Sequence, residues 1–246
     1  MKLSNKGMIL PSAFTAGNIF CGFYAMISAI RGDLEFACWL IVIAGLLDFI
    51  DGKVALLSNT ESNFGMELDS LADISSFGIA PGVIMYQFFL SGPGEWSWLV
   101  SFLFLLCGAL RLARFNVETT GAGKRKFKGL PIPMAAACLI SFVPFSEGPL
   151  FNALFAGIEF NRYLVLMMMI LAGLMVSNVE YPVTPRINPA TIGGKFGLVA
   201  GATLMFCLIY FWKSILFPFA FLYASWGMIR AIVLGVVSRM PDKNSG

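Results

Sequence analysis

Long apolar runs separated by short polar connections make up most of this chain. A membrane-spanning helix needs roughly 20 consecutive apolar residues, and about eight such runs can be drawn. They cover residues 9–30, 34–57, 70–90, 96–115, 130–146, 162–179, 196–212 and 215–238. Little of the chain is left for a soluble domain. The pattern therefore predicts an all-α fold, a polytopic transmembrane helical bundle of about eight spans.

Composition and charge place this bundle in a membrane. Hydrophobic residues make up 58% of the 246 residues and charged residues 13%, whereas soluble domains carry about 25% charged residues. Of the 17 Lys and Arg residues, all but Arg31, Arg162 and Lys213 fall on the side that holds both predicted termini. Since cytoplasmic loops are enriched in Lys and Arg, we expect both termini in the cytoplasm and the protein in the cell membrane. Its expected partners include membrane lipids and exclude nucleic acid.

Four carboxylates interrupt the apolar pattern at one place. Asp48 and Asp51 end the second run, and Asp69 and Asp73 begin the third. Spacings of three and four residues place each pair on one face of a helix, and the polar turn over residues 58–64 requires the two helices to pack side by side. A charge at membrane depth costs about 2.5–3.5 kcal/mol, so the acids predict a functional site on the cytoplasmic side.

Carboxylates gathered in this way predict a metal site. In a low-dielectric pocket they repel one another and become protonated unless cations intervene. Oxygen ligands select Mg²⁺, Mn²⁺ or Ca²⁺, and the chain contains no His, the usual zinc ligand. The structural alternative is pairing of the acids with Lys53, Arg111 or Arg114. Gly52 and Gly65 beside the acids allow a phosphate to approach closely, with helix packing as the alternative reason for both.

The acidic segment resembles the signature of the CDP-alcohol phosphotransferase family, DxxDGxxAR followed after eight residues by GxxxDxxxD. The match runs from Asp48 to Leu56 and from Gly65 to Asp73, and it departs only at the arginine, which is Leu56 here. The flanking runs at 68–81, 109–116, 128–133 and 174–182 resemble the membrane-integral phosphatidylserine synthases of bacteria and archaea. The resemblance implies a six-helix catalytic core over residues 1–182 and two additional helices over residues 183–246.

The resemblance implies a phosphatidyl transfer. In this family the serine hydroxyl would attack the phosphorus next to the diacylglycerol of CDP-diacylglycerol, giving phosphatidylserine and CMP. The family pattern assigns two divalent ions, Mg²⁺ or Mn²⁺ with Ca²⁺ as a further candidate, to Asp48, Asp51, Asp69 and Asp73. It also assigns deprotonation of the alcohol to Asp73. The expected partners are CDP-diacylglycerol, L-serine and a second copy of the chain in a homodimer.

Further polar residues complete the expected site. The residues expected to bind CDP are Thr15, Asn18, Gly52, Lys53, Ala55 and Gly65, and those expected to bind serine or phosphate are Arg111, Arg114, Asn116 and Lys128. Hydrogen bonding between helices is an equal alternative for Thr15 and Asn18, and lipid contact is an alternative for the arginines. Other acceptor alcohols, namely glycerol phosphate, inositol phosphate, inositol and choline, stay open. An ion-coupled transporter is the alternative from a different class.

Overall fold

Every element of the described chain is a helix. The computed structural model describes residues 9–58, 63–90, 96–119, 129–155, 161–179, 213 and 216–237, and the predicted all-α class is confirmed over them. Three helical stretches are long and apolar enough to cross a membrane, Ser12–Ile30, Phe64–Phe88 and Ser97–Glu118, and shorter apolar helices cover Ile132–Ser146 and Arg162–Val176. The count of about eight spans stays a prediction. So does the division into six and two helices, and the predicted span 196–212 lies outside the described residues.

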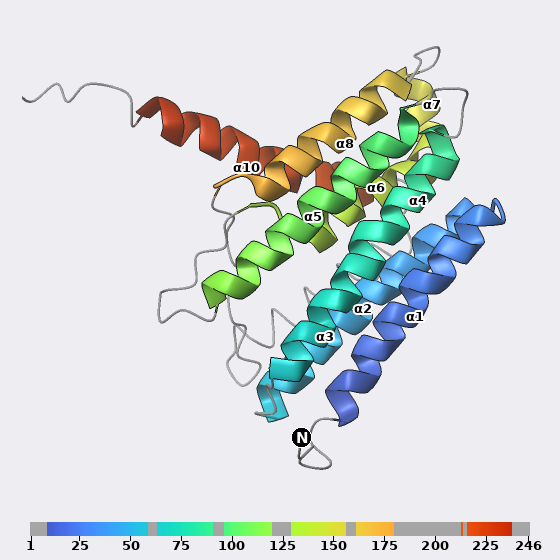
Figure 1. Cartoon of the computed structure of the whole chain (residues 1–246). Helices are drawn as coiled ribbons and strands as arrows, with labels where there is room; N and C mark the ends of the chain where they lie inside the picture. Colours follow the sequence, from blue (N-terminus) through green and yellow to red (C-terminus); the bar gives the residue numbers. More distant parts are fainter. Residues whose placement is uncertain are drawn as a thin grey trace, which may run out of the picture.

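The two N-terminal helices, α1 (Ile9–Ile30) and α2 (Leu34–Ser58), form an antiparallel hairpin (Figure 1). Gly32 closes the turn with φ +86°, a conformation that glycine adopts without a steric penalty. Asp33 Oδ1 accepts a hydrogen bond of 3.2 Å from Phe36 N, which caps the start of α2. No other pair of helices in the described chain packs as extensively. The second half of α2, which carries Asp48 and Asp51, is thereby held against α1.

One long helical stretch carries the second acid pair. It consists of α3 (Asn63–Asp73), the π-helical segment η1 (Ile74–Ile79), α4 (Ala80–Met85) and a second π-helical segment, η2 (Tyr86–Leu90). The helix begins at Asn63, so Asn63 and Phe64 of the predicted turn over 58–64 are helical, and the apolar run predicted from residue 70 begins about two turns into the helix. The π-helical segment η1 follows Asp73 directly, and such segments inside helices are frequent at functional sites.

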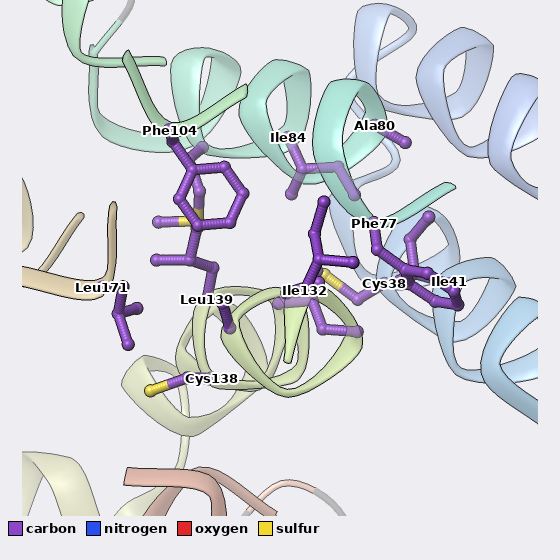
Figure 2. Packing of buried hydrophobic residues seen from close by; sticks show 14 of the residues in the cluster. Cys38, Ile41, Phe77, Ala80, Ile84, Phe104, Ile132, Cys138, Leu139 and Leu171 are labelled. Atoms are coloured by element: carbon purple, nitrogen blue, oxygen red, sulfur yellow. The ribbon is translucent and has the colours of Figure 1, made fainter. Parts of the chain in front are cut away.

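Helix α6 (Ile132–Ser146) lies at the centre of the apolar core. It packs against α2, α4, α5 (Ser97–Thr119), α8 (Asn161–Val176) and α10 (Phe217–Val237), and α5 and α8 also lie side by side (Figure 1). Figure 2 shows Ile132 and Leu139 of α6 among Phe104, Ile84 and Leu171 from three other helices, and all five are buried. Because lipid tails are as apolar as these side chains, close packing is what holds the helices together.

The end of the bundle opposite the acids is closed by aromatic rings and an ion pair. The rings of Phe145 in α6 and Phe217 in α10 lie 5.0 Å apart between centroids, and α7 (Pro149–Phe155) packs beside them. Lys213 Nζ lies 2.8 Å from Glu35 Oε1 in the first turn of α2. At 1.5 Å per residue, Glu35 is about 20 Å along α2 from Asp48. Helix α2 therefore carries an ion-paired acid, Glu35, in its first turn and the acids of the cluster in its second half.

Candidate metal centre

Three carboxylates converge where α2 meets α3. Asp48 and Asp51 lie one turn apart on α2, and Asp69 lies on α3. One carboxylate oxygen of each residue lies within 4.8 Å of the other two. Donors on opposite sides of one divalent cation are about 4–5 Å apart, given metal–oxygen distances of 2.0–2.6 Å. The structure thus brings together three of the four predicted metal ligands at a spacing that suits such an ion.

Asp73 lies one turn after Asp69 and extends the cluster. Its carboxyl group is within hydrogen-bonding reach of Asp48. Asp69 Oδ1 and Asp73 Oδ1 are both buried and have no hydrogen-bond partner in the described part of the chain. A buried polar atom left without a partner is unfavourable by about 1–3 kcal/mol, and by more when it is charged. The donor set therefore fits hard divalent cations, which carboxylate oxygens bind directly.

Positive charge next to the acids comes from Arg111 on α5. This residue is 7% exposed, its guanidinium interacts electrostatically with Asp73, and its Nε has no hydrogen-bond partner among the described residues. Lys53 is exposed, and its Nζ lies 5.3 Å from the centroid of the Phe49 ring. Within the part of the chain that the structure describes, this one buried guanidinium does not balance four carboxylates. Ion pairing between helices is therefore a poor explanation of the whole cluster.

Helix α1 contacts both acid-bearing helices. Thr15 Oγ1 donates a hydrogen bond of 2.9 Å to Asp51 Oδ2, and both residues are buried. One turn further, Asn18 is fully buried, with neither side-chain O nor N bonded to a described residue. Ser76 Oγ in η1 donates to the Asn18 backbone O at 2.9 Å. A Cβ at Gly22 would lie 2.3 Å from the Ser76 hydroxyl oxygen, so the two helices leave no room for a larger residue there.

Gly52 faces open space beside the acids. A Cβ added to it would meet no described atom within 4 Å, so contacts between helices do not require a glycine at this position. This argues against the packing alternative and leaves close approach of a ligand as the better reason for Gly52. Gly65 is partly buried in α3. The side chain of Ala55 and all of Lys128 lie outside the part of the chain that the structure describes.

The predicted acceptor-binding residues on α5 have three different surroundings. Asn116 Nδ2 donates to Ser70 Oγ at 3.0 Å, which joins α5 to α3 between the two acids of that helix. Arg114 donates to backbone carbonyls at the end of α8, the shortest of these bonds being 2.9 Å. Arg111 interacts with Asp73. Arg111 is therefore directly coupled to an acid of the cluster, Arg114 is bonded to the end of α8, and Asn116 is bonded to Ser70.

Two residues of this region were not predicted. Tyr223 on α10 interacts electrostatically with Arg111, and Ser70 bonds to Asn116. The position of Ser70, on the helix turn between Asp69 and Asp73, could have indicated it. Nothing in the local sequence distinguishes Tyr223, since it lies in a largely apolar helix.

Comparison with known proteins agrees with this arrangement. A family model described as CDP-alcohol phosphatidyltransferase matches residues 8–161, a stretch that contains α1 to α7 and all four acids. The chain belongs to this family. The match to the CDP-alcohol phosphatidyltransferases ends at the first residue of α8, so nearly all of α8 and the whole of α10 lie beyond it.

Individual relatives narrow the comparison within the CDP-alcohol phosphatidyltransferases. The chain is 37% identical over 242 residues to the CDP-diacylglycerol–serine O-phosphatidyltransferase of Helicobacter pylori, covering 94% of each protein. It is 36% identical to the archaetidylserine synthase of Methanothermobacter thermautotrophicus, over 74% of this chain and 73% of that one. It is 33% identical to the CDP-diacylglycerol–serine O-phosphatidyltransferase of Bacillus subtilis, over 70% of this chain and 89% of the relative, which is therefore the shorter protein.

Proposed function

We propose that this chain is a phosphatidylserine synthase, a CDP-diacylglycerol–serine O-phosphatidyltransferase of the cell membrane. The observation that carries the proposal is the convergence of carboxylate oxygens from Asp48, Asp51 and Asp69 within 4.8 Å. Serine is favoured over glycerol phosphate, inositol phosphate, inositol and choline by the three relatives, because each is named for serine or a serine lipid. No observation in the described chain favours an ion-coupled transporter.

The acids and their neighbours would hold the donor substrate. Asp48, Asp51, Asp69 and Asp73 would bind two divalent ions, Mg²⁺ or Mn²⁺ with Ca²⁺ as a further candidate. Such ions, when bound, neutralise the diphosphate of CDP-diacylglycerol and stabilise the leaving phosphate. Thr15 would keep Asp51 in orientation, as hydrogen-bonded neighbours of metal ligands do. The remaining residues proposed to contact CDP are Asn18, Gly52, Lys53, Ala55 and Gly65.

The acceptor would enter from the α5 side. Asp73 would accept the proton of the serine hydroxyl as its oxygen forms a bond to the phosphorus that carries the diacylglycerol. The bond between that phosphorus and the oxygen bridging to CMP breaks, and CMP leaves with that oxygen. Arg111, which interacts with Asp73 and whose Nε has no partner among the described residues, would bind the serine carboxylate. Asp73 thus lies between the proposed donor and acceptor sides.

The position of the acids along the bundle suits a lipid substrate. The acyl chains must stay in the membrane while the nucleotide meets a water-soluble amino acid, so the reaction requires a site near the interface. Asp48 and Asp51 lie in the second half of α2, and Asp48 is about 20 Å from Glu35 in the first turn. We assign the acidic end to the cytoplasm from the distribution of Lys and Arg. A homodimer is part of the same proposal.

A CMP-release assay tests this function. Detergent-solubilised protein is incubated with CDP-diacylglycerol, with or without serine and with or without Mg²⁺ or Mn²⁺, and the lipid product is identified by mass spectrometry. We expect CMP and phosphatidylserine only when both serine and a divalent cation are present. Equal CMP release with glycerol phosphate, inositol phosphate, inositol or choline would contradict the assignment of serine. Absence of CMP release under every combination would contradict the transferase itself.

A further inference from the structure

Arg114 on α5 lies where the C-terminal end of α8 meets the residues that precede α6, and we call this place the junction. Helix α8 ends at Val176, and the last carbonyls of a helix have no partner within it. Arg114 Nη1 donates to Val176 O at 2.9 Å, and Nη2 donates to Ser177 O at 3.1 Å and to Met175 O at 3.4 Å. A cation at this position also suits the partial negative charge of a helix C-terminus.

The backbone before α6 occupies the other side of the same helix end. Gly129 N donates to Val179 O at 2.8 Å, and Leu130 N donates to Leu174 O at 3.0 Å. Gly129 has φ +81°, and a Cβ on it would lie 2.2 Å from Met175 O and 2.8 Å from Arg114 Nη2. Backbone and guanidinium therefore enclose this position. Only glycine fits it, on grounds of both conformation and space.

The junction lies one helix turn from Arg111. On the other side of Arg111, a Cβ at Gly108 would lie 2.6 Å from Ile132 Cδ1, so α5 is pressed against the start of α6 there as well. Arg111 is thus bracketed by two tight contacts on α5, at Gly108 and at Arg114. Its own Nε has no partner among the described residues, whereas both terminal nitrogens of Arg114 donate to carbonyls.

We propose that Arg114 is a positioning residue and not a ligand of the substrate: it fixes α8 and the start of α6 so that Arg111 is held at Asp73 for the acceptor. Arg111 and Arg114, which have the same predicted role from the sequence, would therefore have different roles. The part of the proposal that concerns serine rests on the proposed function. The part that concerns the junction rests on the hydrogen bonds and on the space around Gly129.

A double-mutant cycle on stability tests the junction without any substrate. Arg114→Gln and Gly129→Ala are made singly and together in the full-length protein, and the melting temperature in detergent is measured. Because both changes break the same contact, we expect the double variant to melt close to the less stable single variant. Arg111→Gln combined with Gly129→Ala is the matched control, and its effects should add. Additive decreases in melting temperature for Arg114→Gln and Gly129→Ala would contradict the proposed coupling at the junction.

Serine kinetics then separate positioning from binding. Arg114→Gln should raise the KM for serine about fivefold while leaving the KM for CDP-diacylglycerol unchanged, a loss confined to the acceptor side. In the Arg111→Gln background the same change should have no further effect on serine KM, because Arg114 acts through Arg111. A full additional fivefold rise in that background would make Arg114 a ligand and overturn the proposal. If serine is not the acceptor, the double-mutant cycle on melting temperature still tests whether Arg114 and Gly129 are coupled.

Discussion

The two halves of α2 differ in what they bury. The first half buries apolar side chains against the core, namely Ala37, Cys38, Leu40, Ile41 and Ala44. In the second half, Asp51 is 5% exposed while Phe49 is 63% exposed. Packing between helices fully explains the first half. Both halves expose an apolar ring, Phe36 by 42% and Phe49 by 63%, as expected for a helix that faces lipid, but the second half also buries Asp51 beside other acids. Contacts within the described chain do not explain that burial, whereas a bound cation would.

The largest difference between the two halves should appear when an acid is changed at each end. Asp48→Asn should lower CMP release at least about 100-fold, because it removes a carboxylate from the centre of the cluster. Stability without divalent cations should hold or rise, since one repelling charge is gone. Glu35→Gln is the control and should keep full activity, as it breaks only a half-exposed ion pair worth less than about 1 kcal/mol.

Melting temperatures sharpen this test. Added Mn²⁺ should raise the melting temperature of the wild-type protein, because a ligand bound to the folded state stabilises it, and should have little effect on Asp48→Asn. An equal increase in both proteins would mean that the cation binds elsewhere. Equal activity of Asp48→Asn and wild type would contradict the metal centre.

A change in the packed half should have the opposite result. Ile41 is 2% exposed, and Ile41→Ala should lower the free energy of unfolding by about 2–4 kcal/mol through the lost contacts and the cavity left behind. Activity per folded molecule, measured well below the melting temperature, should stay near that of the wild type. Loss of activity without loss of stability would mean that the two halves of α2 do not work separately.

Gly52 allows a test in which stability and activity change in opposite directions. Gly52→Ala should stabilise the helix by about 0.5–1 kcal/mol, because glycine is unfavourable inside a helix. It should raise the KM for CDP-diacylglycerol about tenfold, since a methyl group would enter the space proposed for the nucleotide phosphates. Gly173→Ala on α8 is the matched control, because a Cβ there also meets no described atom within 4 Å. It should stabilise the protein without a change in KM, and equal KM values for the two variants would argue against a ligand at Gly52.

The smallest effect is expected at Tyr223, which extends the comparison to the C-terminal helix. Tyr223→Phe removes a hydroxyl whose charge distribution acts on Arg111, and the KM for serine should rise about two- to fivefold if that coupling positions the guanidinium. Tyr163→Phe, at the far end of α8 and 60% exposed, is the control and should have no effect. A rise in the KM for CDP-diacylglycerol instead would place Tyr223 on the donor side.

Local spacing predicted the acid cluster well. The three- and four-residue spacings of Asp48, Asp51, Asp69 and Asp73 set one face on each helix, and the short connection between those helices placed the faces together. The apolar run predicted from residue 70 begins about two turns after the helix does at Asn63, because Glu67 and Asp69 lower the local hydrophobicity without interrupting the backbone hydrogen bonds. A helix is defined by its backbone hydrogen bonds, whereas the apolar run from residue 70 was predicted from hydrophobicity alone.

Contacts between distant segments could not be predicted in this way. Arg111 and Arg114 have the same chemistry and lie on one face of one helix, yet one interacts with Asp73 and the other caps α8. That difference depends on where α8 ends, which no residue near Arg114 indicates. The interaction of Tyr223 with Arg111 depends likewise on how α10 crosses the bundle. Local periodicity thus predicts which residues share a helix face, whereas their different contacts depend on tertiary packing.

The π-helical segment from Ile74 to Ile79 sets the rotation about the helix axis between α3, which carries the acids, and α4, which packs in the apolar core. Before it, Asp69 and Asp73 face the cluster, and after it, Ala80 and Ile84 face the apolar core. One residue turns an α-helix by about 100°, so a single deletion in this segment would turn one set of side chains away from its target. We therefore expect the number of residues between Asp73 and Ala80 to be essential to the site. Homologues with gaps there should have lost the transfer reaction.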